Sequence, residues 1–179
     1  MLPRMERDSL ATLPNAISLS RLFLAALFPA VHEHDLRLLI LAAAGLTDFL
    51  DGWLARRRHQ FSRVGALIDP FADRIFIFVA IGTLLLEGKV TTLQYGLFLL
   101  RDIATAGAFV IAKSVASLRH ATFKARFSGK LATVLQLFAL PVIVIDRRST
   151  PWAVLVVGVV SLISIADYTV ALWRARERA

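Results

Sequence analysis

The sequence predicts an all-α fold: an integral membrane bundle of six transmembrane helices with a short N-terminal amphipathic surface helix. Three observations lead to this prediction. First, 57% of the 179 residues are hydrophobic and the mean hydropathy is +0.66, whereas soluble domains are roughly 45–50% apolar. Second, long apolar runs alternate with short polar segments along the whole chain, as expected for repeated crossings of a bilayer. Third, most of the basic residues fall in alternate connecting segments.

The composition also excludes several kinds of site. A formal net charge of +8 would suggest a nucleic-acid partner in a soluble protein, but here the basic residues lie between apolar runs. We therefore expect membrane lipids with anionic headgroups as partners, and no nucleic acid. The chain has no cysteine, which excludes disulfides, thiolate metal sites and cysteine nucleophiles. We expect no cleavable signal peptide, because the first residues are polar and of mixed charge.

The N-terminal part is expected to hold the surface helix and the first span. Apolar and charged residues alternate over residues 1–13, which favours a helix lying on the membrane. The first span is expected at about 16–31. Asn15, Ser18 and Arg21 are spaced by three and share one helix face. We interpret this polar stripe as part of a ligand site. The alternative is a helix cap followed by one arginine that reaches the interface.

The remaining spans are expected where apolar runs lie between charged turns. The sequence contains no internal repeat and no second domain boundary, so residues 1–179 are expected to form one transmembrane domain. The expected spans after the first lie at about 36–56, 65–86, 91–115, 131–145 and 151–172.

Four carboxylates interrupt the second and third spans. Asp48 and Asp51 are three residues apart, and Asp69 and Asp73 are four apart, so each pair lies on one side of its own helix. Asp51 and Asp69 lie at similar distances from the basic turn between the spans, roughly 12–14 Å along each helix. Four carboxylates at one depth repel unless cations neutralise them. We expect Mg²⁺ or Mn²⁺, which favour oxygen ligands.

The residues beside the acids favour a bulky phosphate-containing ligand. Gly52 and Ala55 have small side chains, which leaves room next to the carboxylates. Arg56 presents a planar guanidinium that suits phosphate.

Two further polar groups lie in or near the later spans. Arg101 and Asp102 are neighbours in the fourth span, so they point in different directions and each needs its own partner. Either they lock helices together or they support the site. Lys124, Arg126 and Lys130 precede the fifth span. They form either a basic inner loop or a phosphate-binding pocket, and we favour the pocket for Lys130.

The distribution of lysine and arginine predicts the orientation in the membrane. With six spans, fourteen of these residues fall on the side that holds both termini and four on the other. The positive-inside rule then places both termini and the acidic site in the cytoplasm, and we expect a bacterial inner membrane.

The acidic stretch resembles the signature of the CDP-alcohol phosphotransferase family. The pattern matches without a gap or substitution, and eight residues separate Arg56 from Gly65. Looser similarities extend from Asn15, Ser18 and Arg21 at the first span to Gly129-Lys130 just before the fifth. The matching positions of the signature are Asp48, Asp51, Gly52, Ala55, Arg56, Gly65, Asp69 and Asp73.

The resemblance implies a six-helix membrane enzyme, usually a homodimer, that binds CDP-diacylglycerol or another CDP-alcohol. It implies two metal ions held by Asp48, Asp51, Asp69 and Asp73, with Asp73 also the general base. It implies that the nucleotide binds over Gly52, Ala55, Arg56 and Gly65. We add Asn15 and Ser18 from the polar stripe of the first span to this nucleotide-binding set. We assign the phosphate of the acceptor alcohol to Arg21, Lys124, Arg126 and Lys130.

The resemblance is nearest to the phosphatidylglycerophosphate and cardiolipin synthase branches. These enzymes transfer a phosphatidyl group from CDP-diacylglycerol to a glycerol-based phosphate acceptor and release CMP. Arg101-Asp102 stands where the glycerophosphate branch usually has Arg-Glu, and is closer to the cardiolipin branch. A phosphatidylinositol phosphate synthase is the alternative. A divalent-cation transporter is more distant, because the outer halves of the spans are almost wholly apolar.

Overall fold

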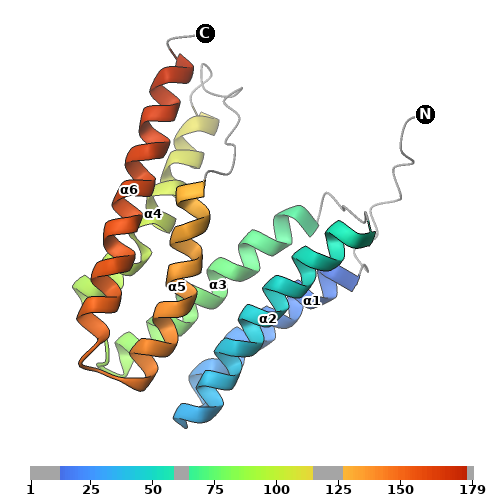
Figure 1. Ribbon diagram of the computed structural model, residues 1–179, viewed down its shortest axis with the longest axis vertical. Coiled ribbons are helices and arrows are strands. Elements are labelled where there is room, and N and C mark those ends of the chain that lie inside the picture. Colours follow the sequence, from blue (N-terminus) through green and yellow to red (C-terminus); the bar gives the residue numbers. More distant parts are fainter. Residues whose placement is uncertain (1–12, 59–64, 115–126, 177–179) are drawn as a thin grey trace. The chain divides into compact units, whose positions relative to one another are not determined.

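The computed structural model describes residues 13–58, 65–114 and 127–176 (Figure 1). The regular structure of these residues is entirely helical, with six α-helices and one short 3-10 helix. The chain divides into two compact units, Met1–Thr83 and Leu84–Ala179. The surface helix expected at residues 1–13 lies outside the described residues, except that Leu13 opens the first helix.

The first unit contains α1 (Leu13–Leu27), the 3-10 helix η1 (Phe28–Ala30), α2 (His34–Arg58) and most of α3 (Gly65–Leu86). Helix α1 begins three residues earlier than the expected span, because Pro14 lies in its first turn. Proline is tolerated there, since a first-turn N–H has no partner within the helix.

Apolar residues at helical spacing form the core of the first unit. Helices α1 and α2 lie side by side, joined through η1 and a short turn (Figure 1). The rings of Phe28 and Phe76 meet edge to face with centroids 6.4 Å apart, which ties η1 to α3. The guanidinium of the buried Arg37 lies 5.2 Å from the centre of the Phe28 ring. Other core residues are Ala25, Ile40, Leu41, Ala44, Ala72 and Ala80.

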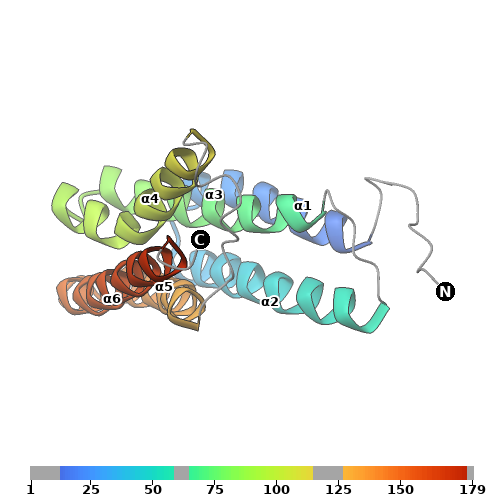
Figure 2. The same ribbon diagram turned by 90° about the horizontal axis from the view of Figure 1, so that it is seen from above.

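The second unit contains α4 (Thr92–Ser114), α5 (Phe127–Ile145) and α6 (Thr150–Arg176). Helix α6 packs against both α4 and α5, as the views in Figures 1 and 2 agree. Helices α5 and α6 extend beyond their expected spans, which were 131–145 and 151–172. The Ser128 hydroxyl donates a hydrogen bond of 2.7 Å to Asp167, so a contact between helices supports the extra turn of α5.

Glycine and capping residues shape the turn between α3 and α4. Gly88 has a φ of +68°, and its N–H donates to the carbonyl of Leu85 while that of Lys89 donates to Leu84. These two bonds form a Schellman motif, which ends α3. Thr91 and Gln94 then form a capping box at the start of α4. The backbone N–H of Gln94 donates to the Thr91 hydroxyl at 3.3 Å, and the backbone N–H of Thr91 donates to Oε1 of Gln94 at 2.9 Å.

The turn between α5 and α6 is held by Asp146. Its carboxylate accepts hydrogen bonds from the Ser149 hydroxyl at 2.6 Å and from the Arg148 N–H at 2.9 Å. These bonds hold the pKa of Asp146 below its ordinary value, because they favour the charged form. The ionised side chain therefore stabilises the start of α6.

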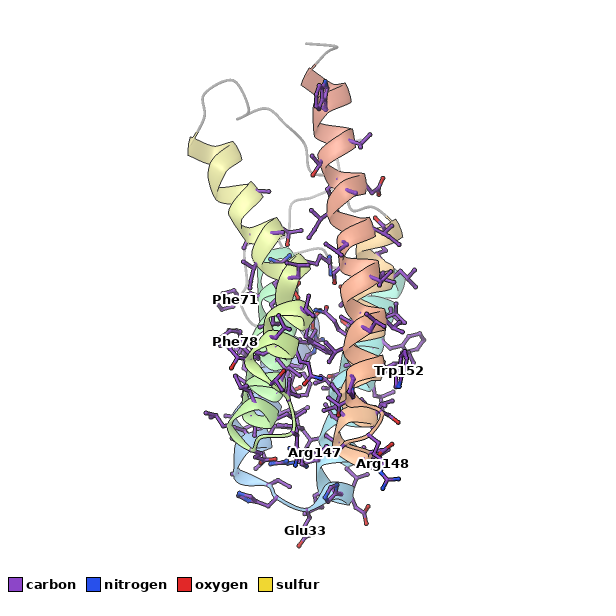
Figure 3. The ribbon with its side chains drawn as sticks, turned by 90° about the vertical axis from the view of Figure 1, so that its left-hand side faces the viewer. Glu33, Phe71, Phe78, Arg147, Arg148 and Trp152 are labelled. Carbon is purple, nitrogen blue, oxygen red and sulfur yellow. The ribbon has the colours of Figure 1, made fainter. Side chains whose placement is uncertain are left out.

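The described helices expose many large apolar side chains. Two of the described helices are long and apolar enough to cross a membrane, over Ser128–Ile145 and Thr150–Val170. A shorter apolar helix covers Ser18–Ala30. Figure 3 shows Phe71 and Phe78 projecting from the same side of α3, and both are exposed. Large exposed apolar surfaces of this kind favour contact with lipid or with another protein.

Candidate functional site

The polar stripe of α1 is buried. Ser18 and Arg21 lie on the same face as the core residues Ala25 and Phe28, and all four are buried. Only 2% of the Arg21 side chain is exposed. The side chain of Asn15 lies outside the described residues, although its backbone forms part of α1. The stripe therefore faces the interior of the first unit at Ser18 and Arg21.

Arg21 lies between carboxylates from the two other long helices of this unit. Its Nη1 atom forms an ion pair with Asp73 of α3, and the same atom lies 3.5 Å from Oδ1 of Asp48 of α2. The two carboxylates are more open than the guanidinium, with 26% and 54% of their side chains exposed. Within the described part of the chain, the positive charge of Arg21 thus faces the negative charges of Asp48 and Asp73, and these acids lie toward the outside of the unit.

The structure brings together one member of each predicted acid pair, Asp48 and Asp73. Helical register places Asp51 one turn after Asp48 on α2, and Asp69 one turn before Asp73 on α3. Among the side chains that the structure describes, no three histidine, cysteine or acidic groups form a metal site, and of the four predicted ligands only Asp48 and Asp73 are among them. The predicted side chains that lie outside the described residues on these two helices are Asp51, Gly52, Ala55, Arg56, Gly65 and Asp69.

A second polar cluster joins α4 to α5 in the second unit. Nη1 of Arg101 donates a hydrogen bond of 2.7 Å to the hydroxyl of Thr133. Nε2 of Gln136 donates to the carboxylate of Asp102 and to the carbonyl of Phe98, both at 2.8 Å. Arg101 and Asp102 therefore each have a partner of their own on α5, as the sequence predicted, but they do not point apart, since Nη1 of Arg101 also lies 3.9 Å from Oδ1 of Asp102. These bonds join two helices, and a role in supporting the site stays a prediction.

The first turn of α5 is fixed from two sides. Ser128 is bound to Asp167 of α6. A side chain at Gly129 would meet the Tyr168 hydroxyl at 3.1 Å and the Arg101 guanidinium at 3.3 Å, so a glycine permits this close approach. Lys130, the next residue, is exposed.

Of the predicted phosphate-binding residues, Arg21 and Lys130 have described side chains, whereas Lys124 and Arg126 lie outside the described residues. The ion pairs of Arg21 are with carboxylates, so its binding to phosphate stays a prediction. Sequence reasoning missed Tyr168, whose contact with Gly129 crosses between distant parts of the chain. The signal for it was its position beside Asp167 in a largely apolar span.

Comparisons with known proteins identify the family. The family model described as CDP-alcohol phosphatidyltransferase matches residues 11–170. The cardiolipin synthase (CMP-forming) of Streptomyces coelicolor is 32% identical over 158 residues, which cover 82% of this chain and 71% of that protein.

Two relatives carry the name CDP-diacylglycerol–glycerol-3-phosphate 3-phosphatidyltransferase. The protein of Aquifex aeolicus is 38% identical over 105 residues, covering 55% of this chain and 59% of that protein. The protein of Rickettsia felis is 27% identical over 144 residues, covering 77% of each. With the acidic residues of α2 and α3 converging in the structure and the family model spanning nearly the whole chain, the protein belongs to the CDP-alcohol phosphatidyltransferase family of integral membrane enzymes of phospholipid synthesis.

Proposed function

We propose that this chain transfers a phosphatidyl group from CDP-diacylglycerol to a hydroxyl of a glycerol-based, phosphate-bearing acceptor, with release of CMP. The observation that carries the proposal is the convergence of Asp48 and Asp73 from different helices on Arg21. One acid from each half of the signature takes part, although a basic turn separates the two halves in the sequence. The names of the relatives support the choice of donor and of a glycerol-based acceptor.

The converging carboxylates fit divalent cations. Their oxygens are hard ligands, and a single guanidinium leaves the pair with a net negative charge. We assign two Mg²⁺ or Mn²⁺ ions to Asp48, Asp51, Asp69 and Asp73. When bound, such ions would neutralise the diphosphate and polarise the phosphoryl group that is attacked.

Asp73 is proposed to act as the general base. Its carboxylate would accept the proton of the acceptor hydroxyl. The acceptor oxygen would then bond to the phosphorus that carries the lipid, while the bond from this phosphorus to the CMP oxygen breaks. Proximity contributes to the rate, because donor and acceptor are held together at one membrane surface.

The nucleotide is assigned to the end of α2 and the adjoining helix starts. The small residues Gly52, Ala55 and Gly65 leave room for the cytidine and the diphosphate, and Arg56 supplies a guanidinium for phosphate. Asn15 and Ser18 of α1 are the polar residues proposed to complete this binding surface.

The acceptor phosphate is assigned to basic side chains near the start of α5. Lys124, Arg126 and Lys130 would attract a phosphate, whereas an uncharged alcohol would not require them. The hydrogen bond from Ser128 to Asp167 of α6 supports this assignment for Lys130, because it holds the turn that carries the exposed lysine side chain. Glycerol 3-phosphate and phosphatidylglycerol both have the required chemistry.

We further propose that all six α-helices cross a bacterial inner membrane and that the enzyme is a homodimer. Both termini and the active site would face the cytoplasm, where nucleotides and Mg²⁺ are available. The excess of lysine and arginine on that side supports this orientation.

An acceptor assay tests the function. Purified protein in detergent would receive CDP-diacylglycerol and Mg²⁺, with glycerol 3-phosphate or phosphatidylglycerol offered separately, and CMP and lipid products would be quantified. We expect CMP release with at least one acceptor and none in EDTA. Product with glycerol 3-phosphate alone identifies a phosphatidylglycerophosphate synthase, and product with phosphatidylglycerol alone a cardiolipin synthase. The absence of CMP with both acceptors would contradict the proposal.

A further inference from the structure

A role in binding the acceptor phosphate does not explain why Arg21 is buried between two carboxylates. Arg21 lies on α1 and is only 2% exposed, beneath the more open carboxylates of Asp48 and Asp73. A charged side chain in an apolar helix bundle is costly unless an opposite charge lies beside it. The guanidinium and the two carboxylates therefore stabilise one another before any metal binds.

We propose that Arg21 is an internal counter-cation that competes with the divalent ions for Asp73 and Asp48. In the metal-free protein its charge holds the two carboxylates together. When a divalent cation binds, the same carboxylate oxygens must turn from the guanidinium to the ion. Arg21 is thus a positioning residue that sets how tightly the metal is held, and this inference rests on the metal site of the proposed function.

The charges explain why the competition matters. Of the described side chains, the carboxylates of Asp48 and Asp73 and the guanidinium of Arg21 together carry a net negative charge, which attracts a divalent cation. The fixed positive charge nearby repels that cation and pairs with Oδ1 of each carboxylate, one of the two oxygens that could ligate it. By linkage, Arg21 weakens metal binding by the difference between its stabilising free energy in the metal-free protein and that in the metal-bound protein. Coupling between sites is typically about 5- to 150-fold in affinity.

The test measures Mn²⁺ affinity by electron paramagnetic resonance on the purified full chain in detergent. Arg21→Met removes the charge and keeps an extended side chain. We expect Arg21→Met to bind Mn²⁺ at least about fivefold more tightly than the unchanged protein. Its metal-free form should unfold at a lower temperature, and saturating Mn²⁺ should raise this midpoint by more than it does in the unchanged protein.

Arg37→Met is the matched control. Arg37 is also a buried arginine of the first unit, 1% exposed, but its guanidinium donates to the Val31 carbonyl at 2.6 Å and lies over the Phe28 ring. It precedes Asp48 on α2 by eleven residues, which is roughly 16 Å of helix. We expect Arg37→Met to lower the unfolding temperature without changing the affinity for Mn²⁺.

The results separate the inference from the proposed function. If the unchanged protein binds Mn²⁺ and Arg21→Met binds it equally or less tightly, Arg21 does not compete and the inference is wrong. If the unchanged protein does not bind Mn²⁺, both the proposed metal site and the inference are wrong. If Arg21→Met does not fold, the Mn²⁺ affinity of Arg21→Lys tests the inference instead, because the single ammonium of lysine interacts less well with two carboxylates. We expect tighter Mn²⁺ binding in that variant too, and equal affinity would overturn the inference.

Discussion

At the scale of single residues, Asp48 and Asp73 share Arg21 but have different surroundings. Asp73 is the more enclosed of the two, on a helix whose neighbouring residues Ala72 and Phe76 are buried in the core. An enclosed carboxylate is better shielded from water, and proton transfer within a shielded site needs less solvent reorganisation. This difference fits the proposed division of roles, in which Asp73 is both ligand and base.

We expect Asp73→Asn to lower turnover by at least about 10²- to 10⁴-fold, the usual contribution of a general base. An amide cannot accept the proton of the acceptor hydroxyl, whereas the nucleotide contacts assigned to α2 remain. Turnover is measured as CMP release, and nucleotide binding by calorimetry with CDP. Asp35→Asn is the control, because it removes an exposed carboxylate from the first turn of α2. Near-normal turnover in Asp73→Asn would exclude Asp73 as the base.

At the scale of the elements, Gly88 shows how a turn depends on one backbone angle. Its φ of +68° closes the Schellman motif after α3, and an added Cβ would meet no atom within 4 Å. Any cost of a side chain at this position therefore comes from the backbone conformation and not from a steric clash. We expect Gly88→Ala to lower the free energy of unfolding by about 1 kcal/mol.

Gly96→Ala provides a control of opposite sign. Gly96 lies inside α4, and a Cβ there also meets no atom within 4 Å. Alanine in a helix interior is favoured over glycine by about 0.5–1 kcal/mol, so we expect this variant to be stabilised. Both are measured by thermal unfolding in one detergent. If the two variants changed stability in the same direction, the left-handed conformation of Gly88 would not be the cause.

At the scale of the whole molecule, the sequence predicted the positions of the helices better than the contacts between side chains of different helices. Apolar runs between charged turns predicted six helices, and the structure has them close to the expected ranges. The start of α5 was missed because Ser128 and Gly129 are held by residues of α6. Periodicity correctly placed Arg21 on the face of Ser18, but could not show that carboxylates from two other helices cover that face.

The proposed orientation can be tested with cysteine labelling, since the chain has no cysteine of its own. We expect Glu33→Cys and Arg148→Cys to react in intact cells with a maleimide that cannot cross membranes. Both residues are exposed in turns assigned to the outer side, and both are labelled in Figure 3. Lys130→Cys, exposed on the first turn of α5, should react only after the cells are permeabilised. The charge asymmetry requires this pattern, so reaction of Lys130→Cys in intact cells would reverse the topology and remove the proposed site from cytoplasmic nucleotides.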